Sequence, residues 1–145
     1  MKRDESLFFT CSLIECIGRE RRQPRAEIVR LLGPDLERIY SHADVFHCEP
    51  ILKVADDFIE RAGIPLGSYD VLSGVRYAIP DCWDIGEVFE RLAEDCAGDL
   101  DVLSALRGIY ASWITPAILN FNSDLYYQPR EYLAACYREG RIIAA

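Results

Sequence analysis

The segment Leu7-Phe-Phe-Thr-Cys-Ser-Leu-Ile-Glu-Cys-Ile17 carries apolar residues at the spacing of an α-helix. Leu7, Cys11 and Ile14 fall on one line of such a helix, and Phe9 and Leu13 fall beside that line. Apolar residues that recur three and four positions apart indicate a helix that packs against a core. The pattern therefore predicts a core-facing helix that ends near the glycine at position 18.

Similar stripes predict further helices along the rest of the chain. Their starts are expected next to prolines, where a missing backbone N–H is tolerated, namely Pro24, Pro34, Pro50, Pro80 and Pro129. Pro116 instead falls inside the apolar stripe from Leu103 to Phe121, so that stripe is either a kinked helix or two helices meeting at Thr115, which would cap the second. We predict an all-α fold, a compact bundle of about six to seven short helices, one kinked or broken at Pro116.

The middle of the chain holds the most loop-like segment, residues 63–70, which contains two glycines and a proline. Residues 71–79 alternate in a way that permits a short strand, but a lone strand would leave backbone groups unpaired, so helix or extended loop is expected. Residues 1–145 are interpreted as one helical domain, with sub-structure 1–63 and 71–145 joined by the loop 63–70, because neither half is comfortably large alone.

Composition sets limits on the classes of function. Half of the 145 residues are hydrophobic, and the formal net charge is −8. This charge argues against a nucleic-acid binder that works by neutralising phosphates, and it suits a protein that meets a basic partner.

No apolar run is long enough to cross a bilayer, and no signal peptide is apparent. We therefore expect a cytoplasmic protein that does not associate with a membrane. The six cysteines form no paired motif and are expected to be free thiols.

The segment Tyr40-Ser-His-Ala-Asp-Val-Phe-His-Cys-Glu49 gathers the side chains that bind metals and move protons. His42, His47 and Cys48 are the metal or thiol candidates, and Cys48, next to an expected helix start, is the candidate for the most reactive thiol. The histidines are five positions apart, however, not the four that place two ligands on one helix face. We therefore favour turn and capping roles here, and we expect no catalytic residue, cofactor or metal.

Two further segments are candidate binding surfaces. Residues 24–44 have the outline of a helix-turn-helix, although acids accompany the basic residues of its second helix, which makes ordinary packing the favoured interpretation. The aromatic segment 120–130 contains Tyr126 and Tyr127, which cannot both point inward on one regular element. With Arg130 they are the candidate interaction residues, because Tyr and Arg are enriched in binding hot spots. That both tyrosines close the core is an equally good interpretation.

The first half of the chain carries four motifs in a fixed order, Leu7-Phe-Phe-x-Cys-x-Leu-Ile-Glu15, Ala26-Glu-Ile-Val-x-x-Leu-Leu-Gly33, Ile39-Tyr-x-x-Ala-Asp-Val-x-His47 and Val54-Ala-Asp-Asp-Phe58. This order resembles that of a small helical family of unknown function in Firmicutes and related bacteria. Members of this family lie in accessory or mobile regions, sometimes beside toxin-like proteins. The resemblance does not extend to the C-terminal half and carries no catalytic residues over. It implies an interaction protein.

Three functions follow from these patterns, and the first is our leading hypothesis. It is a non-enzymatic bacterial interaction module, an acidic neutralising or regulatory partner of another protein, comparable to an antitoxin, whose partner is a second protein or another copy of this chain. The second is a metal- or thiol-dependent site in the segment from His42 to Cys48. The third is a DNA-binding regulator that uses residues 24–44.

Overall fold

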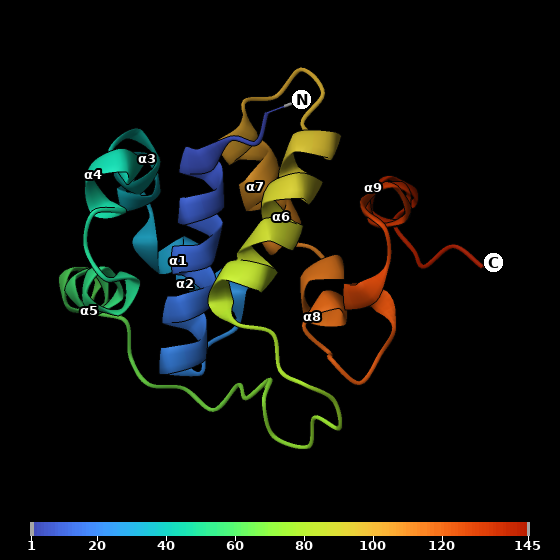
Figure 1. The fold of residues 1–145 in the computed structure, drawn as a ribbon, viewed down its shortest axis with the longest axis horizontal. Helices are drawn as coiled ribbons and strands as arrows, with labels where there is room; N and C mark the ends of the chain where they lie inside the picture. The colour runs from blue at the N-terminus through green and yellow to red at the C-terminus, as the bar shows by residue number, and fades with distance from the viewer. Residues whose placement is uncertain (1, 145) are drawn as a thin grey trace.

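The computed structural model describes residues 2–144, and all regular structure in that range is helical (Figure 1). The elements are α1 (Glu5–Arg21), α2 (Arg25–Leu32), α3 (Asp35–Ser41), α4 (Ala43–Phe46), α5 (Ile51–Ala62), α6 (Cys82–Cys96), α7 (Val102–Tyr110), α8 (Ile114–Ile118), the 3-10 helix η1 (Leu125–Tyr127) and α9 (Arg130–Glu139). The predicted all-α bundle is confirmed. The described residues form more helical elements than the expected six to seven, because α4 and η1 are single turns in segments without an apolar stripe and because the stripe with Pro116 is divided into α7 and α8.

Helix α1 occupies the centre of the bundle and packs against α2, α3, α4, α5 and α6 (Figure 1). Every residue from Phe9 to Gly18 is buried, including the polar Thr10, Ser12 and Glu15. A helix that is surrounded on all sides is buried all round, so its sequence has no polar face. The predicted core-facing helix is therefore present, and its burial extends beyond one stripe.

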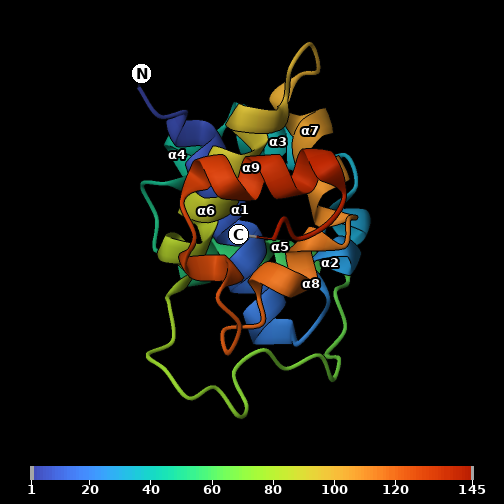
Figure 2. The same ribbon diagram turned by 90° about the vertical axis from the view of Figure 1, so that its right-hand side faces the viewer.

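Helix α6 runs antiparallel to α1 at very short distance. The backbone N–H of Asp4, before α1, donates to Glu94 near the end of α6 (3.0 Å), and Arg19 near the end of α1 donates to the carbonyl of Pro80 before α6 (2.7 Å). A Cβ atom added at Gly86 would lie 2.7 Å from the Cα atom of Ser12. Only glycine permits this approach of the two backbones. Helix α9 in turn lies across α6 (Figure 2).

The stripe that contains Pro116 is broken rather than kinked. Helix α7 ends at Tyr110, and α8 begins at Ile114, so Pro116 lies in the first turn of α8, where its missing N–H has no intrahelical partner to lose. Thr115 is not the cap of this helix, contrary to one of the two expectations. Its hydroxyl instead donates to the carbonyl of Ile109 (2.8 Å), which closes the corner between α7 and α8.

Residues 64–81 connect α5 to α6 without a helix or strand, as the extended-loop interpretation of residues 71–79 predicts. The backbone N–H of Gly67 donates to the carbonyl of Arg21 (2.7 Å), and the backbone N–H of Arg76 donates to the side chain of Asn122 (2.9 Å). Buried side chains before and after this loop belong to one hydrophobic cluster. Among the described residues, no helix combines the length and the apolar composition needed to cross a membrane.

Candidate functional site

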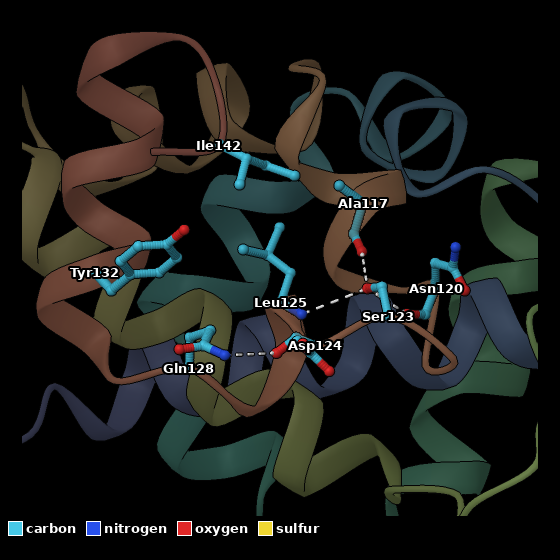
Figure 3. A pocket seen from close by; sticks show the side chains of 8 residues that line it. All are labelled: Ala117, Asn120, Ser123, Asp124, Leu125, Gln128, Tyr132 and Ile142. Carbon is cyan, nitrogen blue, oxygen red and sulfur yellow. Dashed lines mark hydrogen bonds between the residues drawn. The ribbon is translucent and has the colours of Figure 1, made fainter. Parts of the chain in front are cut away.

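An open cavity of about 550 Å³ lies beside η1, between α8, α9 and the C-terminal tail (Figure 3). The residues that line it are Ala117, Asn120, Ser123, Asp124, Leu125, Gln128, Tyr132 and Ile142. Figure 3 shows Leu125 between Tyr132 and Ala117, with polar groups of the turn before η1 around the lower rim. An apolar floor with a few polar groups at its rim is the usual composition of a binding pocket.

Hydrogen bonds fix the chain around this cavity. The hydroxyl of Ser123 donates to the carbonyl of Asn120 (2.8 Å), and the side-chain amide of Gln128 donates to the carbonyl of Asp124 (3.4 Å). The phenol of Tyr132 donates to the carbonyl of Ile143 (2.5 Å), which holds the C-terminal tail against α9. The cavity is thus formed by tethered segments, and an occupant would meet a preorganised surface.

The two adjacent tyrosines of η1 have different environments. Tyr127 is 53% exposed, whereas Tyr126 is half-buried and packs edge-on against Phe121, with the ring centroids 5.5 Å apart. Burial, together with the nearby carboxylates of Asp84 and Asp81, raises the pKa of Tyr126 to about 12, so its phenol is neutral at physiological pH. One tyrosine therefore points to solvent and one covers the core, in agreement with the expectation that both cannot point inward.

Arg130, the third predicted interaction residue, is engaged within the protein. Its guanidinium donates to both carboxylate oxygens of Asp95, at 2.9 and 2.8 Å. This bidentate pair joins the first residue of α9 to α6. Arg130 thus positions the helix that walls the cavity, and a partner would have to compete with Asp95 to reach its donors.

The loop that precedes α6 carries two further exposed apolar side chains, Tyr77 and Ile79, and it is attached to the segment before η1. The side chain of Asn122 accepts from the backbone of Arg76 and donates to the carbonyl of Gly74 (2.8 Å), which attaches this loop to the segment before η1. Two acids, Asp81 and Asp84, form the capping box of α6 close to Tyr126. We call this surface the aromatic face, and define it by six residues, Tyr77, Ile79, Asp81, Asp84, Tyr126 and Tyr127.

The histidine-rich segment forms α4 and the turn after it, and it does not assemble as one site. The exposed His42 places Nδ1 3.2 Å from the carbonyl of Arg38, whereas the ring of His47 stacks on that of Trp83 with centroids 5.2 Å apart. Cys48 is exposed in the turn before α5, and its thiol donates to the carbonyl of Asp44 (3.4 Å). His47, Cys48 and Asp44 share a depression of about 460 Å³ without His42. Within residues 2–144, no three His, Cys, Asp or Glu side chains are grouped as metal ligands.

A buried ionic cluster was not anticipated from the sequence. The guanidinium Nε of Arg25 donates to Glu15 Oε1 at 3.0 Å, and both side chains are completely buried. The phenol of Tyr110 donates to the other oxygen of Glu15, also at 3.0 Å. The available signal was an acid in the middle of the apolar run 7–17, followed by an arginine at the start of the next helix. Buried charges need such partners because the interior solvates them poorly.

Glu90 of α6 is a second buried acid that the sequence did not indicate. It is 0% exposed, and among the described residues neither of its oxygens has a hydrogen-bond donor. Burial, together with the negative charge of the neighbouring Glu94, raises the pKa of Glu90 to about 8. The carboxyl group is therefore protonated in the folded protein at neutral pH.

Comparison with protein-family models, with curated proteins and with solved structures finds no match to this chain. The function must therefore be argued from the geometry of the chain itself.

Proposed function

We propose that this chain is a non-enzymatic interaction module that binds a second protein through the aromatic face and the cavity beside η1. The partner is expected to offer basic groups to the acids of this face and an apolar side chain to the cavity. In this role the chain would neutralise or regulate its partner, as an antitoxin does. The resemblance of the first half to a family found beside toxin-like proteins favours the same class of function.

The observation that carries the proposal is the exposure of Tyr127, which lies in the chain between Leu125 and Gln128, two residues that line the cavity. A tyrosine can bury a large contact area with little loss of side-chain entropy, and for this reason it is common in hot spots. Asp81 and Asp84 lie near Tyr126, Asp124 lines the cavity, and the whole chain carries a charge of −8. A surface with this combination of charge and apolar area is complementary to a basic partner with a protruding apolar side chain.

The two alternative functions have weaker support. A site at the histidine-rich segment would require His42 and His47 to act together, and they face different neighbours. A DNA-binding helix α3 would direct its first turn at the bases, and that turn carries Asp35 and Glu37. Carboxylates there repel phosphates, so we prefer the protein-interaction function.

The proposal is tested with the full chain and with each basic protein that sequencing of its genome finds encoded beside it. Sedimentation velocity of the chain alone first reports whether a second copy is the partner. Isothermal titration of each candidate then gives the dissociation constant. We expect Tyr127→Ala to weaken binding by about 1–3 kcal/mol. We also expect the affinity to fall with added salt, since complementary surface charges are screened.

Leu52→Ala is the matched control, because Leu52 is also an exposed apolar residue (62%) and lies on α5, on the other side of α1 from α8 (Figure 1). This variant should bind as tightly as the unmodified chain. Equal binding by Tyr127→Ala and the unmodified chain would exclude the aromatic face as the interface. Failure of every candidate to bind, together with a monomeric chain, would contradict the proposed function.

A further inference from the structure

Cys16 of α1 and Cys82 of α6 lie opposite each other in the antiparallel pair of helices. These helices approach closely at Ser12 and Gly86, where a Cβ atom added to the glycine would lie 2.7 Å from the Ser12 backbone. Cys16 follows Ser12 by four residues, and Cys82 precedes Gly86 by four. Residues four apart share a helix face, so in antiparallel helices both cysteines lie at the same level of the seam, one turn away from the contact.

The same register holds elsewhere along the seam, which supports the placement of the two thiols. At one end Asp4 contacts Glu94, and at the other end Arg19 contacts Pro80 through its guanidinium. The two thiols lie between these fixed contacts. Cys16 is 3% exposed, and Cys82 is half-buried, so a small oxidant can reach Cys82 while Cys16 lies behind it.

The surroundings of the two thiols differentiate their chemistry. The thiol of Cys16 lies beside that of Cys82, and this neighbour, with the charge of Arg19, lowers the pKa of Cys82. The same contact and burial raise the pKa of Cys16. Cys82 is also the first residue of α6, a position that stabilises a thiolate. Cys82 is thus the nucleophile of the pair, and Cys16 keeps its proton.

We propose that Cys16 and Cys82 form a redox pair, in which a peroxide oxidises Cys82 and Cys16 closes a reversible disulfide between α1 and α6. In the first step the Cys82 thiolate attacks one oxygen of hydrogen peroxide, the O–O bond breaks, and hydroxide leaves and takes up the proton lost by the thiol. In the second step the sulfur of Cys16 attacks the sulfenic acid of Cys82 and water leaves. Two thiols and one peroxide thus give one disulfide and two waters.

This inference is independent of the proposed interaction, and the other cysteines provide its controls. Cys11 and Cys136 are buried, and burial strongly raises the pKa of Cys11. Cys48 is exposed and donates to a backbone carbonyl. Exposure alone would direct the oxidant to Cys48, whereas the proposal directs it to Cys82.

The experiment treats the native full-length protein with one equivalent of hydrogen peroxide, alkylates the remaining thiols after denaturation, and maps the peptides by mass spectrometry. We expect the free thiols to fall from six to four, since one disulfide consumes two of the six cysteines. The linked peptides should contain Cys16 and Cys82, and dithiothreitol should restore all six thiols.

Two variants separate the steps. In Cys16→Ser the sulfenic acid of Cys82 cannot be resolved and should be trapped by dimedone, whereas Cys48→Ser should form the disulfide as the unmodified chain does. Mapping of the unmodified protein needs no variant, so a variant that fails to fold does not affect the test. Oxidation confined to Cys48, or a disulfide between any other two cysteines, would overturn the proposal.

Discussion

The carboxylate of Glu15 and the guanidinium of Arg25 form a completely buried ion pair, with 3.0 Å between Oε1 and Nε. Arg25 also explains the glycine at position 18, because a Cβ atom there would lie 2.5 Å from the Arg25 side chain. Tyr110 completes the cluster from α7 through its phenol. Two consecutive helices, α1 and α2, and the distant α7 are thus joined at one buried charged site. Such a site is costly to disrupt by removing one partner alone.

Arg25→Ala should lower the free energy of unfolding by about 3–5 kcal/mol, because it leaves the buried charge of Glu15 uncompensated. The measurement is urea denaturation followed by circular dichroism. Arg30→Ala is the control, since Arg30 makes an exposed pair with Glu27, and its effect should stay within about 0.5 kcal/mol. The double substitution Glu15→Leu with Arg25→Met should cost less than Arg25→Ala alone. A larger cost for the double variant would mean that the ion pair itself is strongly stabilising.

The helices could be predicted from the sequence because their information is local. The apolar spacing in 7–17 and the proline at position 24 are each read within one or two turns. The pairing of Glu15 with Arg25 and Tyr110 is not local, because it depends on how α1, α2 and α7 pack. The same reason explains why the histidines at 42 and 47, which are close in sequence, suggested a site although the fold separates them. It also explains why the sequence did not indicate that Cys16 and Cys82 lie opposite each other.

The environments of the residues in the aromatic segment could be predicted only in part, because some of them depend on contacts with distant parts of the chain. Adjacent residues on one turn point in different directions, which favoured different exposures for Tyr126 and Tyr127, but the sequence left equally open that both close the core, and the fold decides between the two. The partner of Arg130 does not, because Asp95 is 35 residues away on another helix. The cavity beside η1 also depends on the C-terminal tail, whose position is set by the hydrogen bond from Tyr132.

Gly86→Ala is expected to destabilise the protein, because the new methyl group would meet the backbone of Ser12, which cannot move without separating α1 from α6. Overpacking of this kind typically costs about 1–3 kcal/mol. Gly108→Ala is the matched control within α7, where the nearest neighbour of the new methyl group is the end of the Tyr137 side chain. There alanine should stabilise the helix by about 0.5–1 kcal/mol. Thermal unfolding of both variants reports the difference, and equal midpoints would contradict the close-contact argument.

The stability of the protein should decrease as the pH rises from about 4.5 to about 8, because of Glu90. Its folded-state pKa of about 8 lies above its ordinary value of 4.5, so in this window the folded state binds more protons than the unfolded state. Stability then falls with rising pH, and the Glu90 contribution is complete below 4.5 and lost above about 8. Glu90→Gln removes this group and should flatten the dependence. Urea denaturation of the unmodified chain and of the variant at several pH values measures this dependence. If the free energy of unfolding changed with pH in the same way in both, Glu90 would not titrate in this window.

Tyr126→Ala and Tyr127→Ala should differ in their effects on stability. The ring of Tyr126 packs against Phe121 and is half-buried, so its removal should lower the free energy of unfolding by about 1–3 kcal/mol. Tyr127 is 53% exposed, and its removal should change stability by about 0.5 kcal/mol or less. Urea denaturation of the two variants, in which neighbouring tyrosines are each replaced by alanine, provides the comparison.

The pair of tyrosine variants also tests whether η1 is a surface or a lid. If Tyr127→Ala unfolds as readily as Tyr126→Ala, both rings close the core, and a loss of partner binding in either variant would follow from unfolding alone. The aromatic face would then lose its central contact. If only Tyr126→Ala is destabilised, a weakened association of Tyr127→Ala can be assigned to the contact itself, since the folded population is unchanged.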